Sequence, residues 1–264
     1  MKIRKTILAV IAAAVIALAY TTLSPKLENY LAIKKIEQKN RETMEQIQKP
    51  KPRVIYRAEK APEKTEVETF MEQMGIIVVR EISEEQYLPV QFICQAPLET
   101  EANWVYHEES CEEAAVLQAY LYETGQTMTK QEAHEEILKM IEWQEGNLGS
   151  HRDLYAPGMK EFITGYYGIG EEAVKIIEGA TLDDIKHEIA AGHPVIVPVT
   201  SGLLNNPYYP HPGYHMLTAI GYTKDRIITN DNGTRHGADF SYANEVFDAA
   251  MRDGGGFVMV LKGI

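Results

Sequence analysis

The chain has 264 residues, of which 45% are apolar and 24% are charged. This composition is typical of a globular protein and excludes wholesale disorder and collagen-like architecture. The length fits one domain near the upper size limit, or one domain with appendages. Two cysteines are too few for a disulfide scaffold or a cysteine-rich zinc module.

The formal net charge of −12 is unevenly distributed along the chain. Residues 1–70 contain 14 Lys and Arg against 8 Asp and Glu, whereas residues 71–264 contain 12 against 30. A body this acidic repels phosphate backbones, so we expect the main domain to bind no nucleic acid.

The amino terminus has the pattern of an export signal. Three basic residues among the first five precede an uncharged apolar run over residues 7–23, which is the order found in secretory signals. Small residues around position 18 offer a cleavage site, but the run is also just long enough for a short bilayer span. Residues 1–24 are therefore predicted to be a signal peptide or a membrane anchor, and either one places the body outside the cytoplasm.

Residues 25–69 predict a helical stalk followed by a linker. Apolar residues recur at helical spacing over residues 26–48, which favours a solvated helix, with a weak dimeric coiled coil as the alternative. Prolines end this helix and interrupt the polar stretch after it. The compact domain is expected to cover residues 70–264, and its oligomeric state is left open.

The body places helices before strands. Three helix starts combine a Ser or Thr with an acidic residue three positions later; these are Ser110 with Glu113, Thr129 with Glu132, and Thr181 with Asp184. Further helices are expected at 159–167 and 171–178. Alternating or β-branched runs then predict strands at 194–199, 215–222, 226–230 and 256–262. This order indicates an α+β domain with an antiparallel sheet rather than a doubly wound sheet.

Cys111 is the strongest candidate nucleophile. It would lie in the first turn of a helix, where unpaired backbone N–H groups and the helix dipole favour the thiolate. The alternative is a buried, unreactive thiol. Glu112 and Glu113 act against activation, because neighbouring negative charge raises the pKa of a thiol.

A candidate base and its partner come from a hairpin. His215 begins one predicted strand, and Asp231 ends the next one after a tight turn at 223–225. Counting back from the turn, the two residues fall opposite one another to within about two positions, which is within reach across neighbouring strands. A carboxylate beside an imidazole fixes its tautomer and stabilises the imidazolium. Gln95 is a fourth candidate, as an amide donor to an oxyanion.

The order of Gln95, Cys111, His215 and Asp231 resembles that of the papain-like cysteine peptidases related to the double-glycine leader peptidases that process bacteriocins. The resemblance covers roughly residues 85–262. The segments that carry it are LPVQFICQAP, SCEEAAVLQAYLY, AGHPVIVPV, HMLTAIGYTKDRIITND and GTRHG.

This resemblance implies a papain-like fold, with helices packed on an antiparallel sheet, and hydrolysis of peptide or related amide bonds. It makes Cys111 the nucleophile, His215 the general base, Asp231 its orienting partner and Gln95 the oxyanion donor. The family usually has Gly-Pro after its cysteine, where this chain has two glutamates, and often Asp-Pro where this chain continues with Asn. Papain-type enzymes can use an amide as the orienting group, so Asn230 is kept as an alternative to Asp231. The two glutamates beside the thiol favour the alternative function, an inactive peptide-binding module of the same fold.

No cofactor or metal is expected. The chain contains neither of the common glycine-rich nucleotide motifs. His211 and His215 are four residues apart, but a proline and a glycine between them exclude a helical zinc pair. Cys94 is expected to be a packed thiol, or to pair with Cys111 in an oxidising compartment. The expected partners are a peptide or protein substrate and, if the first segment is uncleaved, the membrane.

Overall fold

The computed structural model describes residues 26–47, 82–209 and 213–264. The chain divides into two compact units, residues 1–42 and 43–264. The expected export segment at 1–24, the linker and the expected domain boundary at residue 70 lie outside the described residues. Among the helices that the structure does describe, none is both long enough and apolar enough to cross a membrane.

The first unit is described only as a helix. Residues 26–46 are helical, which confirms the helix expected there. Three members of its apolar stripe, Leu27, Tyr30 and Leu31, are each more than half exposed. Whether this helix is solvated or paired with a second copy stays a prediction.

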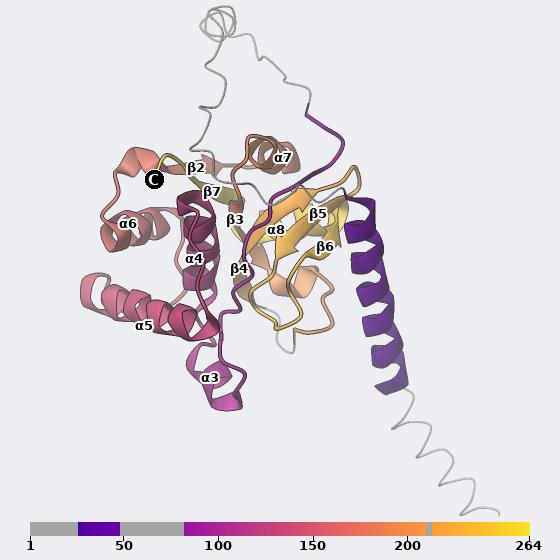
Figure 1. The fold of residues 1–264 in the computed structure, drawn as a ribbon, viewed down its shortest axis with the longest axis horizontal. Helices are drawn as coiled ribbons and strands as arrows, with labels where there is room; N and C mark the ends of the chain where they lie inside the picture. The colour runs from indigo at the N-terminus through magenta and orange to yellow at the C-terminus, as the bar shows by residue number, and fades with distance from the viewer. Residues whose placement is uncertain (1–25, 48–81, 210–212) are drawn as a thin grey trace, which may run out of the picture. The chain divides into compact units, whose positions relative to one another are not determined.

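The second unit is built on an antiparallel sheet. Its path among the described residues is β2-β7-β3-β4-β5-β6, with β1 paired to β4 (Figure 1). The strands are β1 (Gln86–Tyr87), β2 (Val174–Glu178), β3 (Val195–Thr200), β4 (Tyr214–Tyr222), β5 (Arg226–Asn230), β6 (Phe240–Ala243) and β7 (Phe257–Leu261). The central strands are buried along nearly their whole length, because helices pack on the sheet.

The helix that begins at Cys111 forms the centre of the core. α4 (Cys111–Thr124) has almost no exposed residue in its first nine positions, and it packs on β4. A helix that is buried all round shows no clear amphipathic stripe. It ends at Gly125, which has the left-handed backbone (φ 69°) that glycine adopts at helix ends.

The other helices surround this centre. In Figure 1, α4, α5 and α6 lie together on one side of the strands. α8 packs against β3, and α7 packs against β4. Their bounds are α3 (Glu101–Tyr106), α5 (Lys130–Asn147), α6 (Ala156–Tyr167), α7 (Leu182–Ala190) and α8 (Asn244–Asp253).

Most of the expected elements are confirmed, and the fold is α+β with a papain-like arrangement of helices on an antiparallel sheet. The capping boxes at Thr129 and Thr181 are both formed. The helix expected at 171–178 is wrong, because only Glu171–Ala173 is helical, as a 3₁₀ turn, and the rest is β2. Val174 is buried and Lys175 is exposed there, and pairing with β7 satisfies the backbone of this segment.

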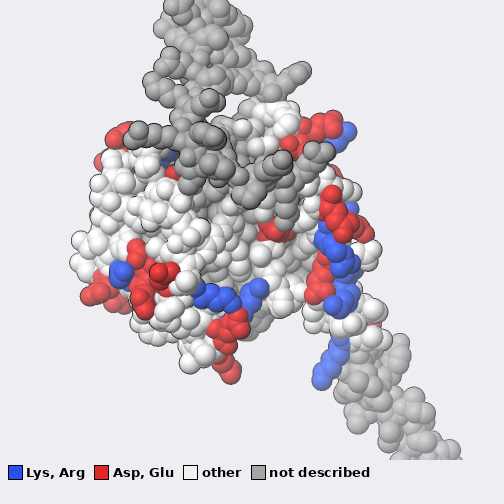
Figure 2. Space-filling model, viewed as in Figure 1, with Lys and Arg blue, Asp and Glu red and all other residues white. Residues whose placement is uncertain are grey.

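One face of the second unit is visible in space-filling view. Figure 2 shows small groups of acidic and basic side chains on this face, separated by wide uncharged areas. The described residues visible there form no continuous basic surface of the kind that neutralises a phosphate backbone. The expected absence of nucleic-acid binding stays a prediction.

Candidate active site

Cys111 is the first residue of α4, as expected, but its surroundings differ from the expectation. Ser110 is the N-cap residue, yet its side chain accepts no hydrogen bond from the helix. Its Oγ lies 3.2 Å from His107 Nδ1 instead. The expected capping box is wrong, because Glu113 turns into the interior and accepts a hydrogen bond from Gln144.

His215 and Asp231 are brought together by the β4–β5 hairpin. His215 Nε2 lies 3.0 Å from Asp231 Oδ1, and both side chains are buried. Thr218 pairs with Asn230 in the ladder, so Asp231 is opposite residue 217, two positions from His215. The contact is therefore the diagonal one that the hairpin count anticipates.

Asp231 is held by more than the histidine. It also accepts hydrogen bonds from the hydroxyls of Tyr209 and Tyr242, and Asn206 Nδ2 lies 3.2 Å from its Oδ2. Burial by itself raises the pKa of Asp231, but the hydrogen bond and charge of His215 together with these hydroxyls outweigh it. The pKa of Asp231 therefore lies below its ordinary value, and the group is ionised at neutral pH.

The alternative orienting residue, Asn230, points elsewhere. Its Nδ2 donates to the Val90 carbonyl at 3.0 Å, so its amide group is used to hold the segment before Gln95. Asp231 is also fixed through its backbone, because its N–H donates to the Gly237 carbonyl at 2.9 Å. A Cβ at Gly237 would overlap the Asp231 carbonyl, which is why this turn requires glycine. The geometry therefore favours Asp231 over Asn230.

Cys111 lies beside the His215–Met216 peptide. The Met216 N–H forms a hydrogen bond with the thiol that favours its ionised form. No hydrogen bond joins Cys111 to His215, both of which the structure describes. His215 faces Asp231 with Nε2, so Nδ1 is the ring nitrogen left to exchange a proton with a reacting group. Gly233 packs on this ring, where a Cβ would lie 2.7 Å from His215 Cε1.

The surroundings of the Cys111 thiol favour its protonated form. Burial raises the pKa of Cys111 well above its ordinary value, and the charge of Glu112 and the hydrogen bond to it add to the rise. Cys111 Sγ donates to Glu112 Oε2 at 2.9 Å. The hydrogen bond from the Met216 N–H lowers the pKa but does not offset these effects.

Gln95 is buried close to these residues but is not aimed at the thiol. Its Nε2 donates to the carbonyls of His107 and Glu108, at 2.9 and 2.7 Å, so both amide hydrogens are used. An oxyanion role would require the side chain to turn away from these carbonyls.

Four residues to which the sequence reasoning assigned no catalytic role complete the site. Asn206, Tyr209 and Tyr242 bind Asp231, and Asn232 Nδ2 donates to the Cys111 carbonyl at 2.9 Å. Asn232 also accepts a hydrogen bond from the Gln95 N–H through its carbonyl, at 3.0 Å. The polar, aromatic run NNPYYPHPG at 205–213 was a usable signal for two of these residues. Nothing local marks Tyr242, which reaches Asp231 from β6.

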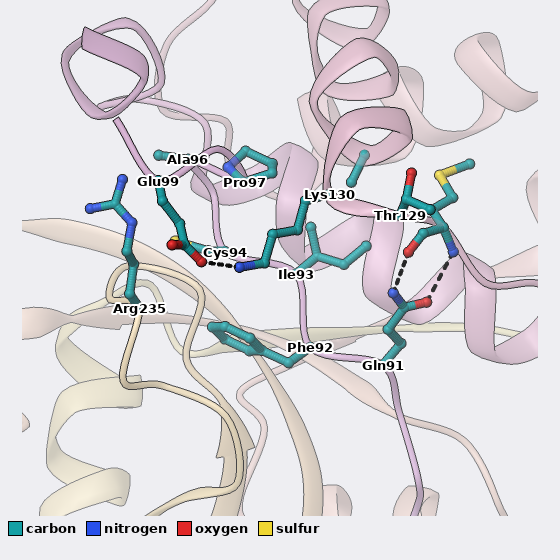
Figure 3. Close-up of a pocket in the computed structure, with 12 residues that line it drawn as sticks. Gln91, Phe92, Ile93, Cys94, Ala96, Pro97, Glu99, Thr129, Lys130 and Arg235 are labelled. Atoms are coloured by element: carbon teal, nitrogen blue, oxygen red, sulfur yellow. Dashed lines mark hydrogen bonds and ion pairs between the residues drawn. The ribbon is translucent and has the colours of Figure 1, made fainter. Parts of the chain in front are cut away.

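The second cysteine lies at a different place. Cys94 and Cys111 are both free thiols. Burial raises the pKa of Cys94 above its ordinary value. Cys94 lines a cavity of about 210 Å³ that includes neither Cys111 nor His215, and Figure 3 shows the Lys130–Glu99 ion pair beside it. The other lining residues are Gln91, Phe92, Ile93, Ala96, Pro97, Met128, Thr129, Ala133 and Arg235.

Comparison with known families finds a match over most of the second unit. The model of the Peptidase_C39 like family matches residues 87–250, which is more than half of the chain. The chain belongs to this family. All four candidate residues, Gln95, Cys111, His215 and Asp231, lie within the part that matches the C39-like family model.

Solved structures include a C39-like relative. One is the crystal structure of a Bacillus anthracis protein assigned as a C39-like peptidase. The match covers 69% of this chain and 99% of the other chain, at 15% sequence identity and a TM-score of 0.49. No curated protein matches the chain.

Proposed function

We propose that this C39-like chain is a cysteine peptidase that hydrolyses peptide or related amide bonds. The observation that carries the proposal is the buried His215–Asp231 pair at 3.0 Å, next to the helix start that bears Cys111. A nucleophile at a helix start, with a base that is itself oriented by a third group, is the arrangement that activates thiols for acyl transfer.

In the proposed reaction, Cys111 Sγ attacks the carbonyl carbon of the substrate while its proton passes to His215 Nδ1. The C=O electron pair moves to the oxygen, and the Cys111 backbone N–H stabilises the resulting oxyanion, with Gln95 once its amide has turned. The imidazolium of His215, stabilised by Asp231, then protonates the leaving amine. Water then attacks the carbonyl carbon of the thioester while its proton passes to His215. The C–S bond breaks, the product acid leaves, and His215 returns the proton to Cys111 Sγ.

A peptide library tests this proposal directly. Incubating the full chain with the library at neutral pH should give cleavage products that disappear after a thiol-directed electrophile has modified Cys111. Mass spectrometry identifies both the products and the modified residue. Cleavage that continues after complete modification of Cys111 would refute the proposed mechanism.

A second function has one specific observation in its favour. Burial and Glu112 keep the Cys111 thiol protonated, and such a thiol is a poor nucleophile. The same fold could then bind peptides without cleaving them. Slow labelling of Cys111 at neutral pH, together with library peptides that are bound but remain intact, would favour this binding module.

We further propose that the body is extracytoplasmic, either secreted or held at the membrane by its first segment. The support is the basic and then apolar order of residues 1–23. If this is correct, protease added to intact cells that express the full chain should cut it within residues 26–68 and release the body. A chain that is cut only after the cells are lysed would contradict export.

A further inference from the structure

Glu112, the residue after the candidate nucleophile, uses both of its carboxyl oxygens. Its Oε2 accepts from Cys111 Sγ at 2.9 Å, and its Oε1 accepts from the Leu154 N–H at 2.9 Å. The residue is only 2% exposed. A carboxylate is seldom buried to this extent unless it is paired with an opposite charge or hydrogen-bonded.

Leu154 belongs to the loop between α5 and α6, and its backbone is held at both ends. Its N–H donates to Glu112, and its carbonyl accepts from Tyr214 Oη at 2.8 Å. Glu112 follows Cys111, and Tyr214 precedes His215. The peptide groups of Leu154 therefore bridge the two chain segments that carry the candidate nucleophile and base.

The charged groups around Glu112 determine how readily it ionises. On α4 these are Cys111 and Glu113, and Glu113 Oε1 lies 3.2 Å from His151 Nε2 in the loop. His151 of the loop and Tyr214 of β4 also interact electrostatically with Glu112, and Asp153 of the loop interacts with Tyr214. Burial, and next the charge of Glu113, raise the pKa of Glu112 to about 8. The pKa of His151 is also raised, because Glu113 outweighs the opposing effect of burial.

We propose that Glu112 is a positioning residue for the nucleophile: with one oxygen it holds the Cys111 thiol protonated and away from His215, and with the other it ties that thiol to the Leu154 loop. The proposal deepens the proposed peptidase function and rests on it. A protonated thiol bound to Glu112 has no proton contact with His215, so the pair becomes active only when this hydrogen bond is released. Movement of the loop at Leu154 and release of the thiol are then one event.

The test separates the charge of Glu112 from its contact with the loop. Glu112→Gln keeps an oxygen that can accept from Leu154 and places an N–H donor beside Sγ. The matched control is Glu113→Gln, which removes the neighbouring buried carboxylate without touching the thiol. The rate of Cys111 alkylation by iodoacetamide is measured against pH on the full chain, with peptide mass spectrometry to distinguish Cys111 from Cys94.

We expect Glu112→Gln to lower the pH midpoint of Cys111 alkylation by about one unit or more, because a like charge next to the thiol is removed. This corresponds to an approximately tenfold faster reaction between about pH 8, above which Glu112 is ionised in the parent, and the alkylation midpoint. Glu113→Gln should lower the midpoint by less than half as much. Equal shifts in the two variants, or no shift in Glu112→Gln, would overturn the proposal.

A second variant tests the link to the loop. Tyr214→Phe removes the hydrogen bond to the Leu154 carbonyl and leaves Glu112 and Cys111 in place. It should raise the alkylation rate at every pH while leaving the midpoint unchanged. An unchanged rate would show that the loop does not hold the thiol. Both measurements report on the thiol without any substrate, so they remain decisive if library peptides are not cleaved.

Discussion

Replacing Cys111 by alanine should reduce peptide hydrolysis to the background rate, a loss on the order of 10⁶-fold if it behaves like other catalytic nucleophiles. The folded body should remain intact, because the change removes only one buried sulfur atom and costs about 1 kcal/mol of unfolding free energy. The measurements are kcat/KM on a peptide identified from the library and the urea midpoint of unfolding.

Cys94→Ser is the matched control for this experiment. Cys94 is also buried and free, but it lies at a cavity that includes neither Cys111 nor His215. The variant should retain hydrolysis. Loss of activity in Cys94→Ser together with retained activity in Cys111→Ala would reverse the assignment of the nucleophile.

Replacing Asp231 by alanine should damage both stability and activity. Its carboxylate is fully buried and accepts from His215, Tyr209, Tyr242 and Asn206, so its removal leaves several buried donors without an acceptor. Breaking a buried pair in this way costs about 3–5 kcal/mol of unfolding free energy. Loss of the imidazolium partner should lower the turnover rate by about 10⁴-fold.

Asp231→Asn is the control for the charge, because it keeps the shape and part of the hydrogen bonding. Asp231→Asn should lose much of the turnover rate, but its loss of unfolding free energy should be smaller than that of Asp231→Ala. Equal unfolding free energies for all three proteins would show that the buried network contributes nothing to folding.

The pH dependence of the unfolding free energy is a second measure of the contribution of the Asp231 carboxylate. The pKa of Asp231 is lowered in the folded state, so its stabilising effect is fully present above its unfolded value of about 3.9. That effect is lost as the pH falls through the lower folded value. The parent should therefore lose stability below about pH 4 more steeply than Asp231→Ala.

The sequence alone determined the local parts of this protein. Thr129 and Thr181 start helices because each has a capping partner three residues away, and both boxes form. The β4–β5 hairpin has a short turn, and despite one irregularity in its ladder between Ala219 and Gly221, counting from the turn places His215 within reach of Asp231. In both cases the interacting groups are close along the chain, and a small number of backbone angles decides whether they meet.

Tertiary structure decided the features that depend on contacts between segments far apart in the sequence. The local signal made Glu113 a capping partner of Ser110, but Gln144 on α5 and His151 in the following loop draw it into the interior. A glycine-bounded segment with acidic residues predicted a helix at 171–178, yet pairing with β7, about 80 residues further on, made it a strand.

The same holds for the chemistry of the site. The sequence predicted that Glu112 opposes ionisation of Cys111, but only the fold shows the direct hydrogen bond and its extension to Leu154, 42 residues away. It left Asn230 and Asp231 as alternatives; in the fold, Asn230 donates to the Val90 carbonyl, whereas Asp231 contacts His215 and accepts from Tyr242 on β6. Burial and pKa shifts depend on which distant segments exclude water from a group, and local spacing contains no information about those segments.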